Sequence, residues 1–432
     1  MPMTERPQKR GLLLVAYWYP PENESGALRP GRFSKYLPRN GFSSHVLAAP
    51  LSSGLEPDAN VHRTGDARGP HPPRWFAMLC RVVQRVAPYN DRLEWVAPAF
   101  TTGSRVLGDS SLVAVISTSP PVASHIAGWL LARRHRLVWI ADFRDPIVGN
   151  PFRTRRLGRW YDTFIERRIV ARADSIIVNT DAALDSFVQR YPRFREKFHL
   201  VWNGYDPDDD LRAKPIPPRA HRVLAHFGSV YGARHPGIVL DSLERLIRGG
   251  RTAAAGIRLR LVGSIDSNGS WLSSGARTFL ASQGCLECTD GMIPREEARR
   301  EMAEADLLLL LDLNELGTGV QVPAKLFEYI RIGRPVLALT SRGSPVERIL
   351  AQARTPHVCL FVGDSEDEID RKLHEFLVLP TDPAAPSAWF HEHFNAAAQT
   401  RSLAAIIDSA LTAADQPAQL ATKQRTTDRS RP

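Results

Sequence analysis

Short apolar runs alternate with helical segments along almost the whole chain, and this alternation constrains the fold more than any other feature. In the first half, apolar runs of strand length occupy residues 12–19, 113–117 and 137–142. Helical periodicity fills residues 122–134 and 156–172. Strands that alternate with helices form parallel sheets with crossover helices on their faces. The sequence therefore predicts an α/β fold with a doubly wound parallel sheet.

The pattern stops at a proline-rich segment and then starts again. Residues 214–219 read KPIPPR, which is typical of a linker. New strand-like runs follow at residues 223–227 and 307–311, with helical segments between them. A chain of 432 residues is also too long for one core of ordinary size. We therefore predict two Rossmann-like domains, at residues 1–213 and 214–385.

The ends of the predicted strands indicate where ligands bind. Open α/β sheets bind ligands at the carboxyl ends of their strands. We expect the two sheets to face each other across a cleft, with the loops at these ends lining it. The polar segment at residues 413–432 is predicted to be a disordered tail.

Charge and cysteine content limit the partners and the compartment. The chain has 56 Lys and Arg against 46 Asp and Glu, which favours anionic partners. No aromatic-basic interleaving or known module indicates nucleic-acid binding, so we expect none. The four cysteines are scattered, which fits a reducing cytoplasm. No apolar stretch approaches the ~20 residues that span a bilayer, and we expect a cytoplasmic protein.

The segment from Trp75 to Val86 has the pattern of a basic amphipathic helix. One helical face carries Trp75, Met78, Leu79, Val82, Val83 and Val86, and another carries Arg81 and Arg85. Such a helix either packs on the domain core or lies on an anionic membrane surface. Both interpretations stay open, and the second would place the protein at the periphery of the inner face of the membrane.

Seven motifs, in order along the chain, resemble family 4 glycosyltransferases. They are LLLVAYWYPPENESGALRPGRFSKYLPRNG, ISTSPPVASH, WIADFRDP, RADSIIVNT, VWNGYDPDD, HFGSVY and, as the most specific, VPAKLFEYIRIGRPVLAL. The resemblance covers roughly residues 11–410. It implies an acceptor-side first domain, a second domain that binds a nucleotide sugar, and a helix at residues 386–412 that crosses back to the first domain.

The same resemblance implies the activity. Family members transfer a sugar, with retention, from a nucleotide-diphosphate sugar to an acceptor. For this chain we expect hexosyl or related sugar transfer to a saccharide or lipid-linked acceptor, in cell-surface polysaccharide or glycolipid synthesis. The nucleotide sugar is a substrate, and no cofactor is expected.

The helix of the last motif carries two candidate residues. Lys325 falls in the first helical turn, where the helix dipole disfavours a cation unless an anion binds there. The resemblance implies that Glu328 bonds the nucleotide ribose and that Lys325 holds the diphosphate. The alternative is an exposed ion pair three residues apart.

A strand that ends at Gly228 and Ser229 would bring backbone close to the ligand. Arg234 follows, and a guanidinium suits phosphate oxygens. The resemblance implies that Arg234 and Lys325 stabilise the charge of the leaving diphosphate. The alternative is that Arg234 is a surface residue at the sheet edge.

Two loops of the second domain are assigned by position alone. The resemblance implies that backbone at Met292 and Ile293 contacts the nucleotide base. Family members often have a glutamate, which contacts the donor sugar, where this chain has Val320. The backbone up to Gln321 would then contact the sugar, and the departure at Val320 leaves the donor's identity open.

The first domain offers four candidates. Arg144 and Asp145 follow an apolar strand, and the resemblance sets them against the donor sugar; the alternative is a structural ion-pair network with Asp142. His125 begins a helix and either contacts the donor or is a satisfied helix histidine. Gly26 either lets the backbone approach the diphosphate or sits in an ordinary turn.

Two further questions concern metal and reaction type. No acidic pair follows a strand as a metal site requires, since residues 208–210 read as a solvated turn, so we expect a metal-independent reaction. Two other functions stay open: a nucleotide-sugar 2-epimerase of the same fold and a non-catalytic nucleotide-binding scaffold.

Overall fold

The computed structural model divides the chain into two compact units. The first comprises Met1–Asn203 and Ala396–Pro432, and the second comprises Gly204–Asn395. The sequence placed this boundary at residues 213 and 214. Residues 204–213 group with the second unit because they bond to it: the Tyr205 N–H donates to Phe394 O, and Arg331 donates to the carbonyls of Asp206 and Asp209. The structure describes residues 9–22, 25–51, 58–64, 75, 78, 82, 89, 91–150, 153, 156–232, 234–266, 270–291, 293–312 and 322–428.

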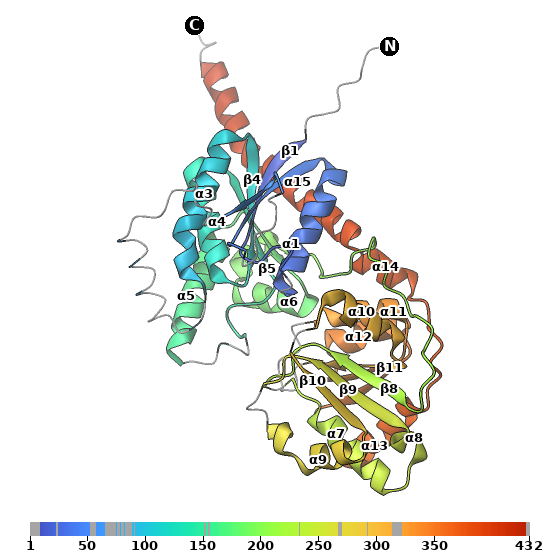
Figure 1. Cartoon of the computed structure of the whole chain (residues 1–432). Coiled ribbons are helices and arrows are strands. Elements are labelled where there is room, and N and C mark those ends of the chain that lie inside the picture. The colour runs from blue at the N-terminus through green and yellow to red at the C-terminus, as the bar shows by residue number, and fades with distance from the viewer. Residues whose placement is uncertain are drawn as a thin grey trace, which may run out of the picture. The chain divides into compact units, whose positions relative to one another are not determined.

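The first unit is built on a seven-stranded sheet in the order β3-β2-β1-β4-β5-β6-β7 (Figure 1). Every neighbouring pair is parallel. The strands are β1 (Arg10–Ala16), β2 (Phe42–Ala48), β3 (Val61–Arg63), β4 (Leu112–Ser119), β5 (Val138–Phe143), β6 (Ser175–Val178) and β7 (Phe198–Leu200).

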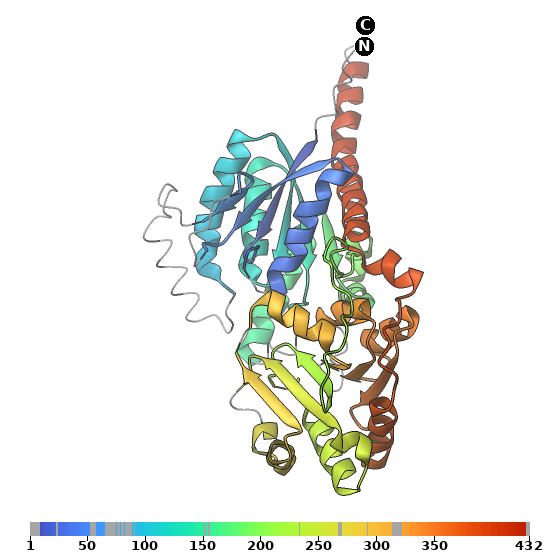
Figure 2. The ribbon, with the colours of Figure 1, turned by 45° about the vertical axis from the view of Figure 1, so that its right-hand side comes forward.

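Helices cover both faces of this sheet. They are α1 (Ser25–Tyr36), α3 (Val96–Asp109), α4 (Val122–His135), α5 (Arg156–Arg172), α6 (Asp181–Arg190) and α15 (Ala396–Asp428). Alternation along β1 explains the layers: Leu13 packs with α3, α4 and α5, whereas Leu12 packs with α1 and α15. Figure 2 shows α1 and α15 together on one side of the sheet.

The helix α15 extends further than the sequence indicated. Its buried residues Leu403 and Ile407 pack on the first sheet. It then continues to Asp428, through most of the segment for which we expected disorder. Several alanines with Leu420 in this segment favour a helix, and the lack of a long apolar run hid that propensity.

The second unit is built on a six-stranded parallel sheet in the order β10-β9-β8-β11-β12-β13. The strands are β8 (Arg222–Phe227), β9 (Ile257–Gly263), β10 (Leu286–Asp290), β11 (Leu307–Leu311), β12 (Val336–Thr340) and β13 (His357–Phe361). The main helices are α7 (Gly237–Arg248), α9 (Gly275–Ser282), α10 (Arg295–Glu304), α11 (Lys325–Ile332), α12 (Pro345–Ala353), α13 (Glu366–Leu377) and α14 (Ala388–Phe394). Figure 1 shows α10, α11 and α12 on one face, and α7, α9 and α13 on the other.

The two sheets share a topological switch point. In each, the first strand pairs on one side with the second and on the other with the fourth, as β1 does with β2 and β4, and β8 with β9 and β11. Crossovers leave in opposite directions there, which opens a crevice at the carboxyl ends of the central strands. The predicted α/β class with two doubly wound parallel sheets is confirmed. Among the helices that the structure describes, none is both long and apolar enough to cross a membrane.

Candidate functional site

Glycines line the carboxyl edge of the second sheet at three adjacent strands. Gly228 follows β8, Gly263 ends β9 and Gly291 follows β10, with φ angles of 156°, 142° and 110°. The Gly228 N–H donates to Val262 O over 2.9 Å, and the Gly291 N–H donates to Gly263 O over 3.3 Å. A Cβ atom on Gly263 would overlap the Gly228 carbonyl. This edge therefore excludes side chains and presents backbone.

A buried histidine at the end of β8 has a pKa that is lowered in part by two nearby cations. His226 is 4% exposed, and its Nδ1 donates to Leu309 O over 3.0 Å. Burial lowers the pKa of His226 to about 4, and the charges of Arg234 and Lys325 act in the same direction. The carbonyl of Leu309 opposes the shift in part. Arg234 and Lys325, 91 positions apart in the sequence numbering, therefore converge at the end of one strand.

A short turn fixes Arg234. Tyr231 and Arg234 exchange two backbone hydrogen bonds of 3.0 and 2.9 Å. The Arg234 Nη1 donates to the Tyr231 hydroxyl over 3.3 Å, and the guanidinium lies 5.5 Å from the Tyr231 ring. Among the residues that the structure describes, none forms a hydrogen bond with its buried Nε. The turn thus holds a cation at the glycine-lined edge while leaving part of its donor capacity unused.

Packing of α11 sets Lys325 and Glu328 beside that edge. Leu326, Phe327 and Tyr329 are buried, and the Tyr329 hydroxyl accepts a 3.0 Å bond from the Phe227 N–H at the end of β8. Lys325 begins the helix, and its Nζ lies 2.6 Å from Glu328 Oε2. Their side chains are 34% and 13% exposed. The ion pair that the sequence left as an alternative is therefore present, at a helix N-terminus that also favours an anion.

The chemistry of this edge suits one kind of ligand. Backbone at Gly228 and Gly263, two cations and a helix N-terminus together favour phosphate oxygens. The Glu328 carboxylate can accept hydrogen bonds from hydroxyl groups. A nucleoside diphosphate, with two phosphates and a ribose, carries both kinds of group.

In the first unit, Arg144 holds three loops together. It follows β5, is 9% exposed, and donates from Nε to Ser119 O over 3.1 Å. Its two terminal nitrogens donate to the carbonyls of Gly26 and Pro120. Burial lowers the pKa of Arg144, while Asp145 and Asp142 oppose that shift. A Cβ atom on Gly26 would overlap the Arg144 guanidinium, so glycine at this position makes room for that contact.

Asp142 belongs to a separate buried ion pair. Asp142 is fully buried and accepts from Arg29, whose Nη2 lies 2.8 Å from Oδ1, and from the Thr118 hydroxyl over 2.8 Å. Arg29 also donates to the carbonyls of Val201 and Trp202. The structural ion-pair network that the sequence left as an alternative therefore includes Asp142. The Arg144 guanidinium instead donates to backbone carbonyls. Asp145, which is partly buried, lies beside Arg144.

His125 is enclosed in the first unit. It is fully buried, its Nδ1 lies 2.8 Å from Ser117 Oγ, and Trp139 Nε1 donates to the same hydroxyl over 2.9 Å. Burial lowers the pKa of His125 to about 3, so the ring is neutral near pH 7. Its ring also lies 4.5 Å from the ring of Phe143. These contacts describe a core histidine that lines an apolar pocket.

Some predicted residues cannot be placed. Met292, Val320 and Gln321 lie outside the described residues, whereas Ile293 is partly buried two positions after Gly291. Ser229 is exposed next to Gly228. Within the described part of the chain, no group of three His, Cys, Asp or Glu side chains is arranged to hold a metal ion.

Sequence reasoning missed Gly263, His226 and Tyr329. A signal for Gly263 was available, because β8 and β9 both end in an apolar residue followed by Gly and Ser, as FGS and VGS. His226 immediately precedes the first of these motifs. Tyr329 lies within the apolar pattern of α11, between the buried residues Phe327 and Ile330, so the sequence gave no separate signal for its hydroxyl group.

Comparison with known proteins gives a family match for the first unit and a shared fold for the whole chain. Residues 31–209 match the model of Glycosyltransferase Family 4. A search of curated proteins found no match. Solved structures with the same fold include sucrose-phosphate synthase from Thermosynechococcus elongatus, at 13% identity and a TM-score of 0.58 over 97% of this chain and 100% of that one. Anabaena HepE in complex with UDP and glucose matches at 14% identity and a TM-score of 0.58 over 93% and 100%.

A third solved structure, trehalose-6-phosphate synthase OtsA, matches at 10% identity and a TM-score of 0.57 over 94% and 99% of the two chains. At these identities the structures establish the fold, which is the two-domain fold of nucleotide-sugar glycosyltransferases. The family match over the first unit confirms the resemblance that the motifs indicated. The family match over residues 31–209 and the shared fold support a glycosyltransferase of the family 4 type.

Proposed function

We propose that this glycosyltransferase takes its sugar from a nucleotide-diphosphate donor bound at the carboxyl edge of the second sheet. The observation that carries the proposal is the convergence of Arg234 and Lys325 on His226, beside the glycines that end β8 and β9. The diphosphate lies against this backbone and the two cations. Glu328 accepts a hydrogen bond from the ribose.

The cations also serve the reaction. When the bond between the anomeric carbon and the diphosphate oxygen breaks, its electron pair stays on the diphosphate. Arg234 and Lys325 stabilise that charge more in the transition state than in the ground state, which is the condition for catalysis. We expect sugar transfer with retention. The reaction needs no metal ion, because the two side-chain cations stabilise the charge that a metal ion would otherwise stabilise.

We assign the first unit to the acceptor side. The Arg144 guanidinium is committed to three carbonyls, so it positions the loop at Gly26 and the turn at Pro120. Asp145, beside it, is the polar group that faces the sugar. His125 contacts Ser117 in the core of the first unit and makes no donor contact in this proposal.

The donor is a UDP-, GDP- or ADP-sugar, and the acceptor is a saccharide or a lipid-linked saccharide. HepE was solved with UDP-glucose, and starch synthase IV from Arabidopsis thaliana with ADP and acarbose, which supports a nucleotide donor here. Sugar transfer to a lipid-linked acceptor would place the enzyme at the cytoplasmic membrane surface. The exposure of Trp75, Met78 and Val82, at 66%, 67% and 50%, supports a membrane contact through the segment at residues 75–86.

Thermal-shift screening against UDP, GDP, ADP and their sugars tests the proposal, because a ligand of the folded state raises stability by mass action. We expect one nucleotide series to stabilise the protein. Release of nucleotide that depends on an added acceptor would then establish transfer. Conversion of the donor sugar without acceptor would indicate a 2-epimerase instead, and binding without turnover would indicate a scaffold.

A further inference from the structure

The exposed face of α5 carries two aromatic side chains that the fold does not use. Trp160 is 74% exposed and Phe164 is 40% exposed. They lie one helical turn apart, with ring centroids 5.5 Å apart and nearly parallel planes. Exposing two large rings to water costs free energy that a contact surface would recover. Trp160 is the most exposed of the large apolar side chains that the structure describes.

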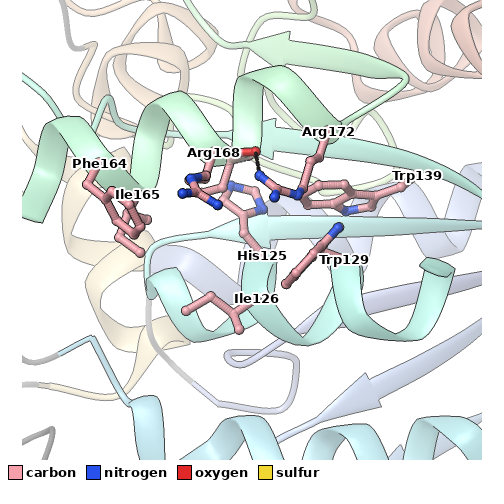
Figure 3. Close-up of a pocket in the computed structure, with 9 residues that line it drawn as sticks. His125, Ile126, Trp129, Trp139, Phe164, Ile165, Arg168 and Arg172 are labelled. Carbon is pink, nitrogen blue, oxygen red and sulfur yellow. Dashed lines mark hydrogen bonds between the residues drawn. The ribbon is translucent and has the colours of Figure 1, made fainter. Parts of the chain in front are cut away.

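An apolar pocket opens behind these rings, between α4 and α5. Its volume is about 200 Å³. Figure 3 shows Phe164 and Ile165 at one end, Trp129 and Trp139 at the other, and Arg168 and Arg172 along the side. The lining is therefore almost wholly hydrocarbon and aromatic, with cations beside it, and it suits the end of an alkyl chain better than a sugar or a nucleotide.

Arginines lie over the rings of Phe164 on α5 and Trp129 on α4. The Arg168 guanidinium lies 4.7 Å from the Phe164 ring, and Arg172 and Arg133 lie 5.0 and 5.8 Å from the Trp129 ring. Cation–π contacts hold these side chains over apolar surface, with their charged ends free to reach anions.

The acidic residues of α5 do not offset this charge. Asp162 is 4% exposed at its side chain and lies 2.6 Å from Arg153. Glu166 is fully buried and binds Arg190 together with the N–H groups of Ile147 and Val148. The helix α4 contains no Asp or Glu. Asp174, just beyond α5, accepts a 2.8 Å bond from the Trp139 N–H. The two helices therefore turn the arginines Arg168 and Arg172 to solvent and bury their own acidic side chains.

We propose that the α4–α5 face docks on an anionic phospholipid surface. Trp160 and Phe164 enter the interfacial region, Arg168 and Arg172 bind headgroup phosphates, and the pocket between the helices takes the end of an acyl chain. An aromatic pair flanked by cations, on a helix whose own acidic side chains are buried, is complementary to such a surface. This face is distinct from the residue 75–86 segment and from the diphosphate edge, and docking does not require sugar transfer.

Tyr89 packs against the start of α5. A Cβ atom on Gly158, in the first turn of α5, would meet the Tyr89 ring at 2.6 Å, so Tyr89 packs closely on the start of α5. The Arg153 guanidinium covers the same ring at 3.9 Å.

Vesicle sedimentation of the full chain tests the proposal. We compare vesicles of phosphatidylcholine alone with vesicles containing 30 mol% phosphatidylglycerol, a composition chosen on the order of natural anionic content. Wild type is expected to bind the anionic vesicles and to be released by high salt. The pair Trp160→Ala with Phe164→Ala should lose at least about tenfold in partition coefficient. The pair Arg168→Ala with Arg172→Ala should lose on the order of 30-fold, at ~1 kcal/mol per arginine.

Matched controls separate docking from folding and from catalysis. Val378→Ala removes an exposed apolar side chain of the second unit, and Arg193→Ala with Arg195→Ala removes the same charge elsewhere on the first unit. Both should bind anionic vesicles like wild type. All variants should keep wild-type circular dichroism and nucleotide binding, so a failure of the proposed sugar transfer would leave the docking result readable.

Equal binding of wild type to both kinds of vesicle, or unchanged binding by the Trp160 and Phe164 pair, would overturn the proposal. So would a wild-type dimer that the same pair of substitutions converts to a monomer, because the face would then be an interface with a second copy.

Discussion

Replacing Lys325 by alanine separates the two roles that its position allows. Without ligand, the change removes the 2.6 Å ion pair with Glu328, which at this spacing contributes ~0.2–0.5 kcal/mol. It also removes a cation from the N-terminus of α11, which returns ~0.3–1 kcal/mol. The two effects largely cancel, so the free energy of unfolding should change by less than about 1 kcal/mol and should not fall by more than a few tenths.

With ligand the balance changes. Lys325→Ala removes a charge-assisted contact to the diphosphate, and kcat should fall on the order of 10²-fold. If the dissociation constant of the nucleotide rises about tenfold, the stabilisation by saturating nucleotide falls by about 1.4 kcal/mol. Steady-state kinetics and urea unfolding, each with and without nucleotide, measure both quantities.

Arg371→Ala is the matched control for Lys325→Ala. It breaks an exposed 2.7 Å ion pair with Glu375, one turn apart on α13. This variant should keep wild-type turnover and nucleotide response. Normal turnover of Lys325→Ala, or an unliganded form clearly less stable than wild type, would refute the catalytic assignment and leave Lys325 as a structural partner of Glu328.

The remaining predictions concern the same edge. Gly263→Ala should destabilise the second unit by more than ~2 kcal/mol, because φ is 142° and its Cβ would overlap the Gly228 carbonyl; Gly275→Ala, with no atom within 4 Å of its Cβ, should be near neutral in urea unfolding. Arg234→Ala should lower kcat on the order of 10²-fold while the fold, measured by circular dichroism, stays intact. Activity should survive excess EDTA, and an absolute, reversible need for magnesium or manganese would disprove metal independence. Because the pKa of His226 falls from 6.5 to about 4 on folding, unfolded chains bind the extra proton and stability is lost as pH falls from about 6.5 to about 4. His226→Asn should therefore reduce the loss of unfolding free energy between pH 7.5 and pH 5 by about 2 kcal/mol, and an unchanged loss would contradict the burial argument.

The central strands were predictable because burial on both faces leaves a continuous apolar signal. LLLLL at Leu307–Leu311 is the clearest case. The edge strand β10 was missed because Leu286–Asp290 reads LECTD, with polar residues at three of five positions. The helix α3 was missed because Val96–Asp109 contains proline and glycine, which weaken the helical pattern.

The parts of the site were predictable, but their contacts were not. Motifs located Arg234, Lys325 and Glu328 one by one. The bond from Arg144 to Gly26 joins residues 118 positions apart, and the bond from Phe227 to Tyr329 joins residues 102 apart. No local pattern encodes such contacts, since they depend on how the strands pair. Only the structure shows that the Arg144 guanidinium is buried against three carbonyls. This observation changes the role that we assign to Arg144 from contacting the donor sugar to positioning loops.

Calorimetric titration of nucleoside diphosphates into wild type and Glu328→Ala is the most direct test of the central claim. The account predicts that one of UDP, GDP or ADP binds wild type and that Glu328→Ala weakens binding at least about tenfold, since a buried ribose hydroxyl would lose its charged acceptor. Glu375→Ala, which removes an exposed carboxylate from α13, should bind like wild type. Nucleotide affinity unchanged in Glu328→Ala, or no binding of any nucleoside diphosphate to wild type, would contradict the placement of the donor at this edge.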